Sequence, residues 1–234
     1  MLDYLDPRCR PSTLDGYGNV TLLLAAVKRA LPGFKGKVLD VGCGLMPYKP
    51  LILSPPSRAE SVIGLDIPNE KYQPDLIWDG RSIPLPDASV DSAMLTEVLE
   101  HCPDAEQVLT EVNRVLRPGG FLFLTVPFIW PIHEVPYDEY RYTPYSLGRI
   151  LKASGFVNAR IEGTGGRHAM LAVILGLWVR RRALTSRVHV VTRKVLSVLL
   201  CPVVWLLMRL DQRPVELGES TLLVGLVATA EKPA

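Results

Sequence analysis

The sequence predicts an α/β fold with one mostly parallel β-sheet and helices on both faces. Short apolar segments alternate along the chain with segments whose apolar residues recur at helical spacing, and strands that alternate with helices usually pair in parallel. A glycine-rich turn, Gly42-Cys43-Gly44, follows the first apolar segment, and an acidic residue follows each of the next two. Ligands of such sheets bind at the carboxyl ends of the strands, so these residues also locate the expected site.

Each element follows from a local pattern. The expected strands are residues 37–41, 61–65, 76–78, 92–95, 121–126, 156–161 and 222–230. Helices are expected at residues 19–31 and 105–117, and residues 117–120 (Arg-Pro-Gly-Gly) predict a turn after the second. A further helix begins with Thr143 as N-cap and Pro144 at its first position, and Gly155 ends it.

Length and composition fit one globular domain, residues 1–234. Of the 234 residues, 48% are hydrophobic and 21% are charged, and the net charge of +2 names no class of partner. Four scattered cysteines lack the spacing of a zinc site, which indicates reduced thiols. Residues 1–6 have neither the basic nor the apolar region of a signal peptide, so we expect a cytoplasmic protein.

The glycine turn and Asp66 together predict a nucleotide-like ligand. Gly42 and Gly44 allow the backbone to approach a ligand closely. Asp66 ends the next strand, 22 residues after Gly44, where an acidic side chain accepts hydrogen bonds from ribose hydroxyls. Taken alone, this pattern leaves open an NAD-dependent oxidoreductase.

Three further residues favour a cationic ligand. Pro47 replaces the third glycine of the dinucleotide pattern, and Asp40 stands two residues before Gly42. A carboxylate there repels a pyrophosphate and attracts an ammonium or a sulfonium. Asp79, after the third strand, is placed to accept a hydrogen bond from an adenine amino group. S-adenosylmethionine (SAM) carries both cations and an adenosyl group, so we expect SAM as the cofactor.

The motifs resemble those of class I SAM-dependent methyltransferases of the type 11 methyltransferase domain family. The resemblance covers about residues 35–163, and its motifs are residues 38–44, 62–66, 85–91, 97–101 and 114–120. It implies a Rossmann-like seven-stranded sheet with strand 7 antiparallel. It also implies that residues of the protein contact the ribose, the adenine and the methionine part of the cofactor. The expected cofactor-binding set is Asp40, Gly42, Cys43, Gly44, Asp66, Ile67, Asp79, Gly80, Thr96 and Glu97.

The loop after the fifth strand carries the candidate catalytic residues. It holds His133, Asp138 and Arg141 among several aromatic residues. His133 suits a general base or a residue that positions the acceptor; alternatively, the three residues form a structural network that orders the loop. The pattern His-Glu-x-Pro-x-Asp-x-x-Arg-Tyr-Thr resembles methyltransferases associated with glycan and cell-surface polysaccharide synthesis.

A second histidine lies in the string Glu97-Val98-Leu99-Glu100-His101. This string resembles a divalent-metal set in O-methyltransferases of ubiquinone biosynthesis, but it is also common in the type 11 domain without a metal. We therefore expect no metal, with His101 packed near the cofactor.

A basic, apolar helical insertion is expected at residues 166–215, between strands 6 and 7. Its apolar runs are residues 169–179 and 195–208, and between Glu162 and Asp211 the chain has eight basic residues and no acidic one. Neither run reaches the roughly 20 apolar residues of a membrane-spanning helix. Amphipathic helices at a membrane interface therefore fit better; packing on the sheet or in a homodimer is the alternative, and nucleic acid is unlikely.

The sequence thus predicts a SAM-dependent O-methyltransferase. Its acceptor is expected to be a glycan, a lipid-linked intermediate or another small molecule, at the inner face of the membrane. Two alternatives stay open: an NAD-dependent Rossmann oxidoreductase, and a non-catalytic module that docks to a membrane or a partner and retains the fold.

Overall fold

The computed structural model describes residues 3–68, 70, 72–181, 187–211 and 214–234. The chain divides into two compact units. One comprises residues 27–162 and 226–234, and the other residues 1–26 and 163–225. The expectation that residues 1–234 form a single domain stays a prediction.

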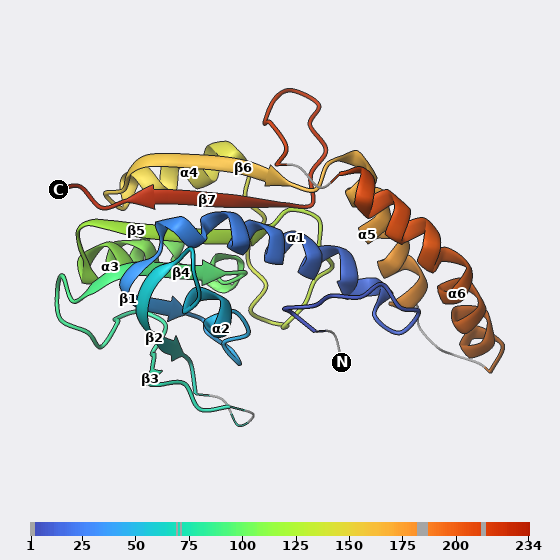
Figure 1. The fold of residues 1–234 in the computed structure, drawn as a ribbon, viewed down its shortest axis with the longest axis horizontal. Coiled ribbons are helices and arrows are strands. Elements are labelled where there is room, and N and C mark those ends of the chain that lie inside the picture. The colour runs from blue at the N-terminus through green and yellow to red at the C-terminus, as the bar shows by residue number, and fades with distance from the viewer. Residues whose placement is uncertain (1–2, 69, 71, 182–186, 212–213) are drawn as a thin grey trace. The chain divides into compact units, whose positions relative to one another are not determined.

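The larger unit is built on the predicted seven-stranded sheet, with strand order β3-β2-β1-β4-β5-β7-β6 (Figure 1). The strands are β1 (Lys35–Val41), β2 (Arg58–Asp66), β3 (Leu76–Ile77), β4 (Val90–Thr96), β5 (Leu116–Pro127), β6 (Val157–Thr164) and β7 (Gly225–Glu231). Strands β1 to β5 pair in parallel, whereas the arrow of β7 points against that of β6 in Figure 1. The predicted fold class is confirmed.

The helices before the insertion are α1 (Leu14–Ala30), α2 (Lys49–Ile52), α3 (Ala105–Val115) and α4 (Pro144–Ala153), with short 3-10 helices at Leu31–Gly33 and Leu99–His101. The three predicted helices form as α1, α3 and α4, and α2 and the two short 3-10 helices were not predicted. Asp104 caps α3 by accepting a hydrogen bond from the Gln107 backbone N–H at 3.0 Å. The predicted cap of α4 is confirmed, because Thr143 Oγ1 accepts from the Ser146 N–H at 3.2 Å.

Several boundaries differ from the prediction, and the largest differences are at the starts of α1 and β5. Helix α1 begins at Leu14, before the expected residue 19. The turn predicted at residues 117–120 is wrong, because β5 already begins at Leu116. Tertiary pairing explains this difference: the Gly119 N–H donates to the Lys232 carbonyl, and the Lys232 N–H donates to the Gly120 carbonyl, each at 3.0 Å. A partner distant in sequence thus keeps the glycine pair within the strand, although Gly119 has a φ of +69° and the pairing with β4 shifts register there.

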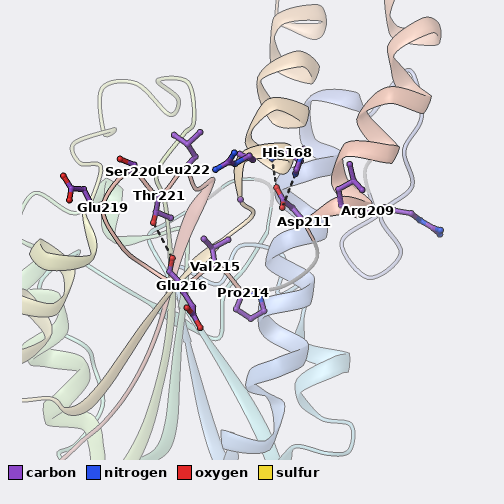
Figure 2. Close-up of a pocket in the computed structure, with 13 residues that line it drawn as sticks. His168, Arg209, Asp211, Pro214, Val215, Glu216, Glu219, Ser220, Thr221 and Leu222 are labelled. Atoms are coloured by element: carbon purple, nitrogen blue, oxygen red, sulfur yellow. Dashed lines mark hydrogen bonds and ion pairs between the residues drawn. The ribbon is translucent and has the colours of Figure 1, made fainter.

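The smaller unit contains the predicted helical insertion as α5 (Arg167–Arg180) and α6 (Arg187–Leu210). Asp211 caps α5 by accepting hydrogen bonds from the backbone N–H groups of His168 (Figure 2) and Ala169. The Sγ atoms of Cys9 and Cys201 lie 3.3 Å apart, a proximity that their separation in sequence does not indicate.

Helix α6 corrects the expectation that neither apolar run is long enough to span a membrane. It continues through Pro202, which the prediction treated as an interruption, because one proline removes only one backbone donor and a helix can accommodate it. Residues Val188–Leu210 form a 23-residue segment with a mean hydropathy of 1.9, and 11% of its most apolar window is buried. By length and composition, α6 can cross a membrane.

Candidate active site

The predicted site lies at one edge of the sheet. Because β1, β2, β4 and β5 are parallel, their carboxyl ends face the same side. This edge carries the glycine turn after β1, Asp66 at the end of β2, Thr96 at the end of β4 and the loop after β5 (Figure 1). The topology therefore gathers residues from distant parts of the sequence.

The glycine turn leaves room for a ligand at Gly44. Gly42 and Gly44 have φ angles of +65° and +50°, which favour glycine. A Cβ atom at Gly42 would lie 2.5 Å from Val98 Cγ2, whereas a Cβ atom at Gly44 would have no neighbour within 4 Å. Gly42 is thus required by packing, and Gly44 borders open space.

Asp66 organises this turn with both carboxylate oxygens. Oδ2 accepts hydrogen bonds from the Gly44 N–H at 2.8 Å and from the Tyr72 hydroxyl at 3.1 Å. Oδ1 accepts from the Ile67 N–H at 2.8 Å. The sequence analysis missed Tyr72, since an isolated tyrosine in a loop carries no motif.

Asp40 is a buried carboxylate that forms no salt bridge within the described part of the chain. Its side chain is almost fully buried, and Oδ1 has no hydrogen-bond partner among the described residues. Burial and the nearby charge of Asp66 raise the pKa of Asp40 from 3.8 to about 7, against a lowering effect of Lys49. A cation bound nearby would satisfy this carboxylate, so the site fits a positively charged ligand better than a pyrophosphate.

The other predicted cofactor residues flank this centre. Asp79 is exposed, and its Oδ1 accepts from the Arg81 and Ser82 N–H groups at 2.8 Å, which lowers its pKa. Gly80 has a φ of +81° and borders open space. At the end of β4, Thr125 Oγ1 donates to Glu97 Oε1 at 2.9 Å. Cys43 is buried, which raises its thiol pKa to about 12.

The predicted catalytic residues lie together in the loop after β5. His133 Nδ1 is 3.3 Å from Asp138 Oδ2, and the His133 backbone N–H donates to the same oxygen at 3.1 Å. Arg141 donates two hydrogen bonds to Asp138, at 2.6 and 2.9 Å. This pairing holds the pKa of the Asp138 carboxyl well below its usual range. The structure therefore contains the network that the sequence analysis considered, with His133 at its end.

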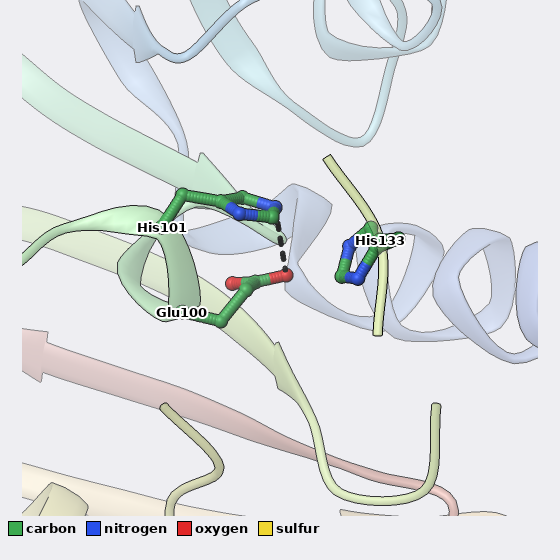
Figure 3. A group of neighbouring side chains, drawn as sticks. All are labelled: Glu100, His101 and His133. Atoms are coloured by element: carbon green, nitrogen blue, oxygen red, sulfur yellow. Dashed lines mark ion pairs between the residues drawn. The ribbon is translucent and has the colours of Figure 1, made fainter. Parts of the chain in front are cut away.

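This loop is fastened to the 3-10 helix Leu99–His101. The Glu139 and Tyr140 N–H groups both donate to the Glu100 carbonyl, at 2.8 and 3.1 Å, and the Tyr142 hydroxyl donates to the Leu99 carbonyl at 3.0 Å. These bonds bring His133 against His101, with ring centroids 4.7 Å apart (Figure 3). Glu100 lies beside both histidines. The sequence analysis considered residues 97–101 as a possible metal set but did not predict Glu100 to be a site residue.

Comparison with known proteins finds similarity to methyltransferases. Residues 39–124 match the family model of a methyltransferase domain. A probable S-adenosylmethionine-dependent methyltransferase of Mycolicibacterium smegmatis is 38% identical over 149 residues, which are 55% of this chain and 54% of the relative. The 27-O-demethylrifamycin SV methyltransferase of Amycolatopsis mediterranei is 34% identical over 110 residues, 39% of this chain and 40% of the relative. The chain thus spans about half of these curated relatives or less.

Solved structures show the same fold at low sequence identity. A putative sarcosine dimethylglycine methyltransferase from Galdieria sulphuraria superposes with a TM-score of 0.57 at 16% identity, over 98% of this chain and 93% of that one. A SAM-dependent methyltransferase from Archaeoglobus fulgidus gives 0.54 at 19% identity, over 92% and 93%.

The fold is that of class I SAM-dependent methyltransferases. Within the chain, residues 39–124 are the part that is similar to the methyltransferase domain family. SAM is the cofactor of this class, and the unpaired Asp40 carboxylate and the open space at Gly44 fit it.

Proposed function

We propose that this protein transfers a methyl group from SAM to an oxygen of a glycan, a lipid-linked intermediate or another small molecule. One observation carries the proposal: His133, held by the Asp138–Arg141 pair, belongs to a loop that starts at the strand edge bearing Asp40 and Asp66. Bound SAM would supply an electrophilic methyl group on a sulfonium. The protein then has to orient the acceptor and exclude water.

The residues of the site divide these tasks. Asp40 compensates the positive charge of the ligand, and Asp66 accepts hydrogen bonds from ribose hydroxyls. Asp138 accepts from the Nδ1 side of His133, which leaves Nε2 to receive the acceptor hydroxyl. An NAD-dependent reaction is not favoured, because the buried Asp40 carboxylate would face a pyrophosphate of like charge.

Calorimetric titration of SAM tests the cofactor assignment. We expect saturable binding to the wild-type protein and binding weakened at least tenfold in Asp66→Ala, since charged hydrogen bonds contribute about 1.5–3 kcal/mol. Asp87→Asn, an exposed residue outside the site that pairs with Arg114, is the matched control. Absence of SAM binding by folded wild-type protein would refute the proposal, and saturable NADH binding would favour the oxidoreductase.

His133→Ala tests the proposed role of His133 towards the hydroxyl of the methyl acceptor. We expect this variant to retain SAM affinity and to lose about 100-fold or more in methyl incorporation into a hydroxylated acceptor. Unchanged turnover would remove His133 from the reaction.

We further propose that α6 docks the protein on the cytoplasmic face of the membrane, where lipid-linked acceptors are found. Large apolar side chains of α6 are exposed, among them Val188, Val198 and Leu199. Residues 163–210 contain eight basic residues and no acidic one, which suits anionic headgroups. A homodimer interface is the competing explanation for this exposed apolar helix.

Flotation with vesicles separates the two explanations. We expect wild-type protein to float with vesicles rich in anionic phospholipid, and Val198→Glu/Leu199→Glu to remain in the pellet. The control Tyr145→Glu places the same charge at an exposed residue of α4. A soluble wild-type dimer that ignores vesicles, and that the double variant converts to a monomer, would show packing instead.

A further inference from the structure

Glu100 is a buried carboxylate that its surroundings leave unsatisfied. Its side chain has 0% exposure, and neither Oε1 nor Oε2 has a hydrogen-bond partner among the described residues. The Nε2 atom of His101, at 3.8 Å from Oε1, is too distant for a hydrogen bond. Burying such a group without a partner costs several kcal/mol, so the arrangement calls for a ligand that bonds to it.

The two neighbouring histidines are already oriented by their other ring nitrogens. His101 Nδ1 lies 3.1 Å from the Tyr137 carbonyl oxygen, and His133 Nδ1 lies 3.3 Å from Asp138 Oδ2. Both acceptors select the tautomer that carries its proton on Nδ1 and presents a lone pair on Nε2. Metal-binding histidines are characteristically held in this way by a carbonyl or a carboxylate.

The three side chains converge on a common point. One ligand atom from each of Glu100, His101 and His133 lies within 4.8 Å of the other two. Figure 3 shows the Glu100 carboxylate directed to the space beside both imidazole rings. Glu134 adds a second carboxylate, with Oε2 at 3.8 Å from His101 Nε2. The hydrogen bonds of Glu139 and Tyr140 to the Glu100 carbonyl hold the loop in this position.

We propose that Glu100, His101 and His133 bind a divalent transition-metal ion of the Zn²⁺ type. Two imidazoles and one carboxylate form a donor set that suits such an ion. Three protein ligands leave a tetrahedral ion one open position, as in catalytic zinc sites. This assignment departs from the expectation of no metal, because only the fold brings the loop histidine to the Glu-His pair.

The ion also defines what His133 does, and this part rests on the proposed methyl transfer. An acceptor oxygen in the open position would bind the ion directly. The ion would lower the pKa of that hydroxyl, as zinc lowers the pKa of bound water. His133 Nε2 then binds the ion in place of the direct contact with the acceptor hydroxyl proposed above. His133 thus positions the acceptor through the ion, and Asp138 is the residue that orients His133. A single hydroxyl oxygen is the group that one open position accommodates.

Metal titration in the absence of SAM tests the site. Untagged full-length protein is stripped with a chelator and titrated with Zn²⁺ against a chromophoric competitor, and with Co²⁺ by visible absorption. We expect one ion per chain, a Co²⁺ spectrum typical of nitrogen ligation, and affinity at least tenfold weaker in Glu100→Gln and in His133→Gln. Asp138→Asn should weaken binding by about 10–100-fold, as removal of a histidine's supporting carboxylate does elsewhere.

His189→Gln, which changes an exposed histidine of α6, is the matched control and should bind the ion like wild type. Glu100→Gln preserves side-chain shape, and thermal denaturation verifies that each variant is folded. No stoichiometric Zn²⁺ binding, or equal affinity in wild type, Glu100→Gln and His133→Gln, would overturn the proposal. SAM titration of the same samples separates the two proposals: SAM binding without metal binding defeats only the metal site, and the reverse defeats only the methyl-transfer assignment.

Discussion

Arg141 binds Asp138 through two hydrogen bonds of 2.6 and 2.9 Å, and Asp138 in turn contacts both the backbone and the ring of His133. The Asp138 side chain is only 3% exposed. Arg141 also donates to the Trp130 carbonyl at 3.2 Å, so a single guanidinium joins the two sides of the loop. The loop that carries His133 is therefore ordered by one nearly buried ion pair.

Asp138→Asn tests this relationship. The change leaves Arg141 without its charged partner in a largely buried position, which costs about 2 kcal/mol or more of unfolding free energy. We expect a lower unfolding midpoint in urea, a large loss of methyl transfer and unchanged SAM affinity. Glu139→Gln, which alters a charge in the same loop, is the control. An unchanged midpoint would show that the ion pair does not order the loop.

The buried Asp40 predicts a pH-dependent affinity for SAM. Its pKa is raised from 3.8 to about 7 in the folded protein, so the carboxyl is largely protonated below pH 7. A cationic ligand favours the ionised form, and binding below pH 7 then requires release of a proton. We expect SAM affinity to rise up to tenfold per pH unit towards pH 7 and to level off above it. Asp40→Asn should bind weakly with no such dependence, and a pH-independent wild type would contradict the assignment.

The same group predicts how stability depends on pH without a ligand. Because the folded-state pKa of Asp40 lies above its unfolded value, its contribution to stability is complete below about pH 4 and is lost as pH rises through 7. The negative charge of Asp66 raises the pKa of Asp40, and the positive charge of Lys49 lowers it. We expect Asp40→Asn to unfold at higher urea concentration than wild type at pH 8, and equal or lower stability of the variant would refute this reasoning.

Tyr72 occupies an oxygen of Asp66 that the proposed ribose contact would use. Its hydroxyl donates to Asp66 Oδ2 at 3.1 Å, and SAM would have to displace it. An ordinary hydrogen bond contributes about 1 kcal/mol, so we expect Tyr72→Phe to bind SAM about fivefold more tightly in calorimetry. Tyr145→Phe, on the exposed face of α4, is the control. Weaker binding in Tyr72→Phe would mean that the hydroxyl contacts the ligand instead.

The two glycines of the turn should respond differently to alanine. Both have positive φ, which costs a non-glycine residue about 1–2 kcal/mol. At Gly42 the new Cβ would also collide with Val98, whereas at Gly44 it would enter open space. We expect Gly42→Ala to lower the thermal midpoint more than Gly44→Ala, and Gly44→Ala to remain folded while losing SAM affinity. Equal stability of the two variants would argue against this difference.

The sequence by itself determined the fold class and which acidic and glycine residues stand at the carboxyl edge of the sheet. Alternation of strands and helices, the glycine turn and acidic strand ends are local patterns, and parallel pairing brings those ends to one edge. Capping residues such as Thr143 and Asp104 likewise act within a few residues of their own position, so the starts of α3 and α4 were readable.

Only the tertiary structure decided the partnerships between distant residues. Lys232 binds the backbone of Gly119 and Gly120, and Pro202 lies within a continuous α6. His133 lies beside Glu100 and His101, although its loop is some 30 residues further along the chain. Backbone hydrogen bonds to Glu100 hold this loop in place. Such contacts form only when folding brings distant segments together at the edge of the sheet. The sequence shows which hydrogen-bond donors and acceptors exist, but it does not show which of them pair.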